Sequence, residues 1–318
     1  MDPIAPLSRA LVQLSDGLLR QTLLRLGVHE RVAVLQGVQI HYYHRPAVPA
    51  TPLHWWVQLF QTFWCWITRK PVDRRPTPLL LVHGLGDNAL TWSFVLEFLG
   101  VGRDVYAIDL PGYGYSGLPA GQRCASFDQM RDLIGVFVRE VIQRPTVIAG
   151  NSMGAWLAVR VAEQDPELVR ELVLLNAGGA MLAGRSSWEP FRQVVAMPDL
   201  KAARLAIRQV VGFVPAPLIY IGQHGIFERF RRMVVQSFVE TAEERDFLSP
   251  EELQQLQTPV SLLWGMEDTF LPPGSFEFFR QNLPNATVHV IRHCGHLPQR
   301  ERPLAVARFL EQRAAAWD

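Results

Sequence analysis

The chain has 318 residues, of which 48% are hydrophobic and 19% are charged, and its formal net charge is +1. A chain of this size and composition can bury a substantial core, and it lacks the low hydrophobicity and high net charge that cause disorder. The near-neutral charge provides no long-range field for nucleic acid, so we expect no partner of that class.

Cysteine usage and the N-terminus bear on the cellular location. Cys65, Cys124 and Cys294 are far apart and form no C-x-x-C pair, which indicates neither a disulfide framework nor a cysteine metal site. The N-terminal residues Met1–Ile4 contain no basic segment that leads into an apolar run. We therefore expect no secretory signal and a cytoplasmic location.

The N-terminal part of the chain predicts a helix followed by a hairpin. Leucines at helical spacing over residues 7–26 form one apolar face opposite a charged face. Residues 32–43 have the pattern of two short strands around Gly37. We assign residues 1–31 to an N-terminal amphipathic helix and begin the core at residue 32.

From residue 77 onward, short apolar runs alternate with helical stretches. The strand-like runs are 79–82, 105–108, 146–149, 172–175, 260–264 and 288–291. The helical stretches lie at about 88–99, 127–142, 153–164 and 303–316. This alternation predicts an α/β fold, with a mostly parallel sheet covered by helices on both faces.

Residues 177–258 interrupt the alternation. They contain helical runs, such as 200–211 and 227–239, and no strand-like run. The interval is too long for a loop in a compact domain, so we interpret it as a helical cap inserted between two core strands. The core is then divided into residues 32–176 and 259–318.

The segment Thr146–Gly154 runs from a strand into the pattern G-x-S-x-G, and a helix follows. Gly150 and Gly154 allow a sharp turn without a Cβ clash, which places the Ser152 hydroxyl at the tip of a strand-to-helix turn. The helix N-terminus favours negative charge that develops there. We predict that Ser152 is a nucleophile. The alternative is an ordinary tight turn with an exposed serine.

A serine hydroxyl becomes a good nucleophile only when a base takes its proton. Of the nine histidines, His296 lies just after the strand-like run 288–291 and ahead of the final helix, and we predict that it is the general base. His293 is the local competitor, but it lies nearer the strand and lacks a preceding glycine. His83 precedes the first core helix and is interpreted as shaping that turn.

Such a site also needs a carboxylate to orient the histidine and N–H donors to bind the oxyanion. Asp268 follows the run 260–264 and is the predicted acid, with the adjacent Glu267 as the alternative. The predicted donors are the backbone N–H groups of Met153, which follows the nucleophile, and of Leu85.

Together these segments resemble the α/β-hydrolase superfamily over roughly residues 32–316. The motifs, in chain order, are HGLG (83–86), DLPGYGYS (109–116), GNSMG (150–154), WGMED (264–268) and CGHLPQRERP (294–303). The resemblance implies a capped core sheet and a two-step acyl-enzyme mechanism, without a metal or an organic cofactor. The order Ser152, Asp268, His296 is the order found in this fold.

The serine excludes the haloalkane dehalogenase and epoxide hydrolase branches, which use an aspartate there. We predict an esterase or lipase that cleaves small-molecule or lipid esters with an apolar acyl chain. The predicted cap contains many apolar residues that could line an acyl pocket, although helix packing explains them equally well. They are Phe191, Val194, Val195, Ile207, Val210, Val211, Phe213, Leu218 and Ile219.

The main alternative is a carbon–carbon bond hydrolase of the meta-cleavage-product group, in which GNSMG also occurs. Members usually have a tryptophan after the histidine, whereas this chain has Leu297. Their cap arginine stays unassigned among Arg185, Arg192, Arg204, Arg208, Arg229, Arg231 and Arg232. Acyl transfer to an alcohol and cofactor-free perhydrolysis use the same residues. A non-catalytic binding protein of the same fold is the alternative outside enzymes, although no triad residue is lost here.

Residues 46–76 form an aromatic-rich insertion between the hairpin and the next strand. Four tryptophans fall within 54–68, and four basic residues follow by residue 75. The run is too short to cross a bilayer, which takes ~20 apolar residues, but aromatic and basic residues favour a membrane surface. We hypothesise that 52–70, with the helix at 7–26, makes a peripheral membrane contact. The alternative is that the two segments pack together as extra core. The oligomeric state is left open.

Overall fold

The computed structural model describes residues 4–48, 75–182 and 185–318, which form an eight-stranded sheet in the order β1-β2-β4-β3-β5-β6-β7-β8. The strands are β1 (His29–Leu35), β2 (Val38–Arg45), β3 (Leu79–Val82), β4 (Val105–Ile108), β5 (Thr146–Asn151), β6 (Val169–Leu175), β7 (Val260–Gly265) and β8 (Thr287–Ile291). The pairs β1–β2 and β2–β4 are antiparallel, and the other neighbouring pairs are parallel. The mostly parallel α/β sheet predicted from the sequence is confirmed.

The predicted hairpin around Gly37 is also confirmed. Leu35 pairs with Val38 at the end of β1 and β2. Gln36 and Gly37 have φ angles of 50° and 78°, so both central residues of the turn are left-handed. Turns of this kind match the twist of the flanking strands.

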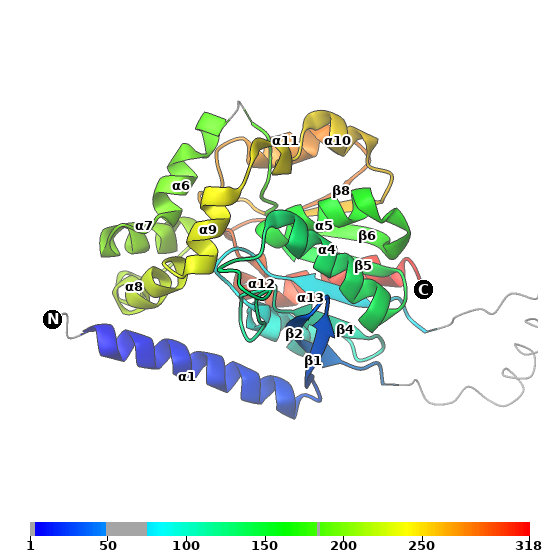
Figure 1. The fold of residues 1–318 in the computed structure, drawn as a ribbon, viewed down its shortest axis with the longest axis horizontal. Coiled ribbons are helices and arrows are strands. Elements are labelled where there is room, and N and C mark those ends of the chain that lie inside the picture. The colour runs from blue at the N-terminus through cyan, green and yellow to red at the C-terminus, as the bar shows by residue number, and fades with distance from the viewer. Residues whose placement is uncertain (1–3, 49–74, 183–184) are drawn as a thin grey trace, which may run out of the picture.

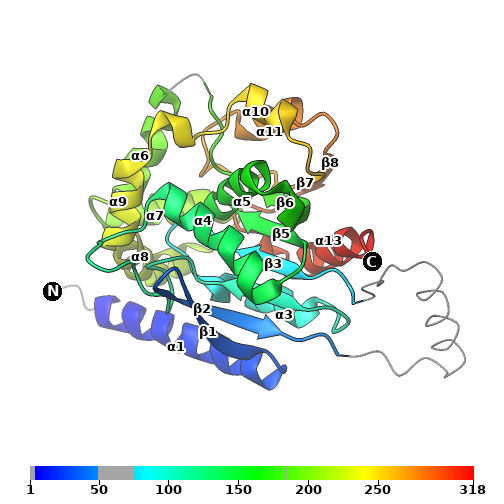
Figure 2. The same ribbon diagram turned by 45° about the vertical axis from the view of Figure 1, so that its right-hand side comes forward.

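Alternate side chains of β3 enter two separate cores, because successive residues of a strand point to opposite faces. Leu80 and Val82 join the core under the first helical layer, whereas Leu79 and Leu81 join the core under the second. The first layer contains α4 (Phe127–Phe137), α5 (Met153–Gln164) and α11 (Ser275–Asn282), and the second contains α1 (Ile4–Arg25), α3 (Ser93–Phe98) and α13 (Pro303–Ala315). Figures 1 and 2 show the sheet between these helices.

Short helices complete the core. They are the 3-10 helices η1 (Ala89–Trp92) and η3 (Pro166–Leu168), the π-helical turn η2 (Val138–Ile142) and α12 (Pro298–Glu301). The helices expected at 88–99 and 127–142 therefore each change type along their length: η1 leads into α3, and α4 leads into η2.

Between β6 and β7 the chain is helical, as the sequence predicts. The elements are η4 (Arg185–Trp188), α6 (Glu189–Val195), α7 (Leu200–Val210), α8 (Ala216–Phe230), α9 (Met233–Thr241), η5 (Glu244–Asp246) and α10 (Pro250–Gln255). The expected helical run 227–239 is broken, because Arg232 is extended (φ −56°, ψ 137°) and separates α8 from α9. Helices α6 to α9 lie together beyond one end of the sheet, whereas α10 lies beside α11 (Figures 1 and 2). The domain boundaries at 177 and 259 stay predictions.

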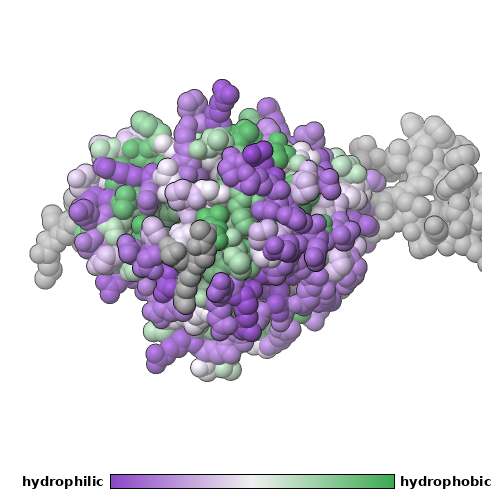
Figure 3. Space-filling view, turned by 90° about the horizontal axis from the view of Figure 1, so that it is seen from above, coloured by the Kyte–Doolittle hydropathy of each residue, from purple (hydrophilic) through white to green (hydrophobic). Residues whose placement is uncertain are grey.

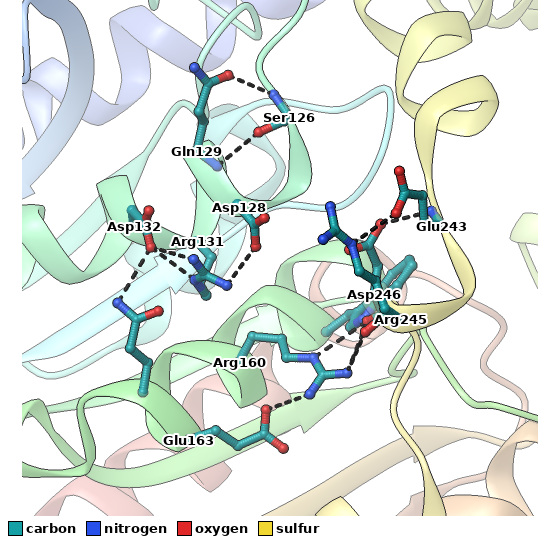
Figure 4. A network of polar contacts seen from close by, with 12 residues as sticks. Ser126, Asp128, Gln129, Arg131, Asp132, Arg160, Glu163, Glu243, Arg245 and Asp246 are labelled. Carbon is teal, nitrogen blue, oxygen red and sulfur yellow. Dashed lines mark hydrogen bonds and ion pairs between the residues drawn. The ribbon is translucent and has the colours of Figure 1, made fainter.

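Arg160 on α5 anchors the end of this helical region to the core (Figure 4). Its guanidinium donates to the carbonyl oxygen of Phe247 at 2.7 Å. It also pairs with the carboxylates of Glu163 and Glu252 at 2.8 and 2.7 Å. The Arg160 side chain is only 12% exposed, so these partners compensate its positive charge for the loss of contact with water.

Helix α1 lies along α8 with its leucine stripe turned outward. Ser8 donates to the carbonyl oxygen of Ile221 in α8, and Leu23 is fully buried against the second core. Leu11, Leu14 and Leu18 are instead 39%, 59% and 56% exposed. Figure 1 shows α1 at the edge of the molecule, packed on one side only.

Two observations bear on membrane contact. Within the described ranges, no helix combines the length and the apolar character needed to cross a membrane. The face seen from above carries apolar patches that polar side chains divide from one another (Figure 3). Most of the insertion at 46–76, including 52–70, lies outside the described residues.

Candidate active site

Ser152 sits between the last residue of β5 and the first residue of α5. Its φ of 55° and ψ of −117° are unusual for a residue with a side chain, so the turn is strained. The residue is 7% exposed. Met153 begins α5, and its N–H therefore has no carbonyl partner within the helix.

Two glycines make this turn possible. A Cβ on Gly150 would lie 2.4 Å from the backbone nitrogen of Ala155, and one on Gly154 would lie 2.5 Å from the carbonyl oxygen of Val82. Both distances are far inside van der Waals contact with backbone atoms that cannot move aside. The spacing G-x-S-x-G thus reflects the close approach of β3, β5 and α5.

His296 and Asp268 form a buried pair at the ends of neighbouring segments. The His296 Nδ1–H donates to Asp268 Oδ2 at 2.7 Å, and the two side chains are 4% and 2% exposed. The other carboxylate oxygen accepts from the backbone N–H groups of Phe270 and Leu271 at 2.9 and 3.2 Å. Burial alone would raise the pKa of Asp268, but His296 and these hydrogen bonds hold it below its usual range.

Glu267 and His293, the alternative acid and base considered from the sequence, pair with each other instead. Glu267 Oε1 accepts from the backbone N–H of His293 at 2.9 Å and lies 3.1 Å from its Nδ1. The two side chains are 40% and 85% exposed, so this pair is at the surface. The structure places Asp268, rather than Glu267, against His296.

Asn176 is a site residue that the sequence interpretation missed. It follows β6, has a φ of 41°, and donates from Nδ2 to Asp268 Oδ2 at 2.7 Å. Its Oδ1 accepts from the N–H of Gly265 at 2.9 Å, which ties the ends of β6 and β7 together. The sequence did contain a signal for this residue. Asn176 is a polar residue at the carboxyl end of β6, and β6 is the neighbour of β7, which precedes Asp268.

A second set of polar contacts holds the loop that carries His296. Asn151 Nδ2 donates to the His296 carbonyl oxygen at 3.0 Å. Glu301 accepts from the backbone N–H groups of Gly295 and Gly212 at 3.0 and 2.9 Å. The histidine loop is therefore fastened both to the serine turn and to the end of α7.

The turn after β3 lies directly over Ser152. A Cβ on Gly84 would be 3.1 Å from the Ser152 Cβ, which shows how close the two turns come. Leu85 lines the cavity beside Ser152, and its role as an oxyanion donor stays a prediction. His83 is buried and shapes this turn as predicted: its Nδ1–H donates to the Gly84 carbonyl at 2.8 Å and its Nε2 accepts from the Leu110 N–H at 3.0 Å. Burial lowers the pKa of His83, which keeps it neutral.

Two cavities meet at Ser152. The main cavity, of about 400 Å³, includes His296 and has apolar walls from α7 and α8. Of the apolar residues predicted to line an acyl pocket, Ile207, Val210, Val211 and Leu218 face it. A second cavity, of about 50 Å³, lies on the Met153 side and has aromatic walls, including Phe191. Phe213 is 83% exposed and faces neither cavity.

Charged groups enter the main cavity beside the turn after β3. Asp87 Oδ1 lies 3.0 Å from Arg229 Nη1 and 2.9 Å from Arg300 Nη2. Of the seven arginines of the predicted cap, Arg229 therefore faces the main cavity, and Arg192 lines the second.

Comparison with known proteins identifies the family to which this fold belongs. Residues 79–309 match the sequence profile described as the alpha/beta hydrolase family. The protein is thus a hydrolase of the α/β fold. Because the match covers most of the chain, this chain belongs to the alpha/beta hydrolase family.

Individual relatives span several activities within that family. The chain is 30% identical over 255 residues to 2-hydroxymuconate semialdehyde hydrolase of Pseudomonas putida, covering 76% of this chain and 88% of the relative. It is 28% identical over 235 residues to pimeloyl-[acyl-carrier protein] methyl ester esterase of Nitrosomonas europaea, covering 69% and 88%. A solved membrane phospholipase A, described as a bacterial virulence factor, superposes with a TM-score of 0.74 at 23% identity, covering 98% and 92%.

Proposed function

We propose that the protein is a serine carboxylester hydrolase that cleaves esters with an apolar acyl chain through Ser152, His296 and Asp268. The observation that carries this proposal is the joint position of Ser152, on its strained turn, and the His296–Asp268 pair at one mainly apolar cavity. The similarity to a methyl ester esterase supports ester chemistry.

The proposed mechanism follows from the hydrogen bonds of His296. Because Nδ1–H donates to Asp268, Nε2 is the ring nitrogen that can take the proton of Ser152 as its hydroxyl attacks the ester carbonyl. The backbone N–H groups of Met153 and Leu85 bind the oxyanion of the tetrahedral intermediate. His296 then gives the proton to the leaving alkoxide. Water, activated by the same nitrogen, releases the acid from the acyl-enzyme.

The test is hydrolysis of p-nitrophenyl esters from acetyl to palmitoyl, with Ser152→Ala measured in parallel. We expect turnover of medium or long chains by the wild type and its loss in the variant. The main cavity leaves room for such a chain along α7 and α8. A wild type that is inert on every ester, or a fully active Ser152→Ala, would overturn the proposal.

Carbon–carbon bond hydrolysis is the second candidate. The relative from Pseudomonas putida carries a name of that group, and Arg229 reaches the main cavity from the region between β6 and β7. A ring-cleavage dienone assayed beside the ester series separates the two. Turnover of the dienone without turnover of any ester would favour this candidate.

We further propose that the outer face of α1 makes a peripheral contact with an anionic membrane. Leu11, Leu14 and Leu18 form an exposed stripe along α1. Arg25, which is also exposed, lies two helical turns after Leu18 on the same face. Co-sedimentation with anionic vesicles is the measurement. Binding should weaken in the double variant Leu14→Ser, Leu18→Ser. A protein that ignores such vesicles altogether would contradict this contact.

A further inference from the structure

Asp87 and two arginines lie together at one end of the main cavity, whose walls are otherwise mainly apolar. Asp87 follows the turn that carries Leu85, Arg229 comes from α8, and Arg300 comes from α12. Three segments that are distant in the sequence therefore bring one carboxylate and two guanidinium groups to the cavity that Ser152 faces.

Both guanidinium groups use the same carboxylate oxygen, Asp87 Oδ1, at 3.0 and 2.9 Å. A guanidinium has five N–H donors. Within the described part of the chain, the Arg300 side chain donates one other hydrogen bond, from Nε to Thr91 Oγ1 at 2.8 Å. Arg229 and Arg300 are 19% and 35% exposed, so unused donors can be reached from the cavity.

The other carboxylates nearby are engaged differently. Glu301 lines the same cavity, but its two oxygens accept from the N–H groups of Gly295 and Gly212. Asp16 lies 3.8 Å from Arg229 Nη2, beyond hydrogen-bond distance. The free hydrogen-bonding capacity of the two arginines, rather than net charge, is what distinguishes this end of the cavity.

We propose that Arg229 and Arg300 form a subsite for an anionic oxygen group, a carboxylate or a phosphate, carried by the ester substrate. This proposal rests on the proposed ester hydrolysis and narrows its substrate class to acidic esters. Planar guanidinium groups match the geometry of such anions. The apolar part of the substrate then lies along α7 and α8, and its charged end lies at the arginines.

The competing explanation is that the two arginines only fasten α8 and α12 to the turn after β3. A fastening role would change thermal stability and would affect all esters alike. An anion subsite would instead change the preference between acidic and neutral esters, which is the quantity to measure.

The experiment compares two matched ester pairs, so that it also shows where the charge lies. Monomethyl suberate against methyl octanoate places the charge on the acid part. Monooctanoyl glycerol phosphate against monooctanoyl glycerol places it on the alcohol part. The ratio of kcat/KM values is measured for the wild type, Arg300→Gln, Arg300→Lys and Arg229→Gln. The control is Arg280→Gln, because Arg280 is 50% exposed on α11 and pairs with Glu277.

We expect the wild type to prefer the acidic member of at least one pair by about tenfold or more, which is the effect of one charge-assisted hydrogen bond. The preference should be lost in both Gln variants, partly kept in Arg300→Lys and unchanged in Arg280→Gln. Hydrolysis of the neutral esters without any acidic preference would overturn the subsite. A preference that survives in both Gln variants would do the same.

Binding without turnover separates this proposal from the proposed function. Octyl phosphate and octanol are titrated calorimetrically into Ser152→Ala with and without Arg300→Gln. We expect octyl phosphate to bind about tenfold more tightly than octanol, and Arg300→Gln to remove the difference. Equal binding overturns the subsite. If the wild type hydrolyses no ester at all, the proposed function fails, and this titration still decides whether the anion site exists.

Discussion

At the residue scale, the turn that carries Ser152 depends on two missing side chains. Gly150→Ala would place a methyl group 2.4 Å from the backbone nitrogen of Ala155. We expect a loss of about 3 kcal/mol in the free energy of unfolding, because backbone must shift to make room. Urea denaturation measures it. Gly17→Ala on α1 is the control, since its Cβ meets nothing within 4 Å and should not destabilise the protein.

Asn176 is a positioning residue that acts through Asp268. Asn176→Ala removes the 2.7 Å hydrogen bond to Oδ2 and the contact with Gly265. We expect kcat on a short ester to fall about tenfold, the effect of one hydrogen bond to a charged group, and KM to change little. The pH profile of kcat should change as well, because the His296–Asp268 pair loses a partner. An equal change in kcat and KM, with an unaltered pH profile, would indicate general disruption instead.

At the scale of elements, His41 links β2 to β1 and to the segment that follows β4. This β2 residue lies 2.7 Å from Asp109 and 2.9 Å from Glu30 of β1, and Glu30 also accepts from Arg20 of α1. Burial alone would lower the pKa of His41, but Asp109 and Glu30 raise it above the ordinary value of a histidine. The protonated ring can donate to both carboxylates.

The sign of the pH dependence follows from that raised pKa. The stability that His41 contributes is fully present below its unfolded pKa and is lost as the pH rises through its folded pKa. We expect the difference in Tm between the wild type and His41→Gln to be larger near about pH 6 than near about pH 9. Thermal melts at both pH values measure it. A difference that grows with pH would contradict this assignment.

At the scale of the whole molecule, Arg160 joins the helical region to the core. Arg160 is 12% exposed, and Arg160→Met leaves the carboxylate of Glu163, which is 23% exposed, without its cation and the carbonyl oxygen of Phe247 without its donor. We expect a loss of about 3 kcal/mol in the free energy of unfolding. Arg131→Met is the matched control on α4, where the partner carboxylates are 50% and 39% exposed, and it should cost about 1 kcal/mol or less. Comparable losses in both variants would show that burial does not set the effect.

Much of the fold could be predicted because its signals are local. The short apolar runs became the strands of the parallel part of the sheet, and the hairpin forms around Gly37 as expected. The sequence predicted Asp268 as the acid but left Glu267 as an alternative, because both residues follow β7. The choice depends on which carboxylate faces the His296 loop once β7 and β8 are paired.

The sequence by itself determined the order of strands and helices along the chain. It also determined the glycine-bounded turn at Ser152, because both features depend on limits that act within a few residues. Only the tertiary structure decided which side of α1 is exposed and which apolar residues line the main cavity. It also brought Arg229 and Arg300 to Asp87, across 142 and 213 positions of the chain. Such contacts depend on how whole helices pack against the sheet, and no local pattern of residues encodes that packing.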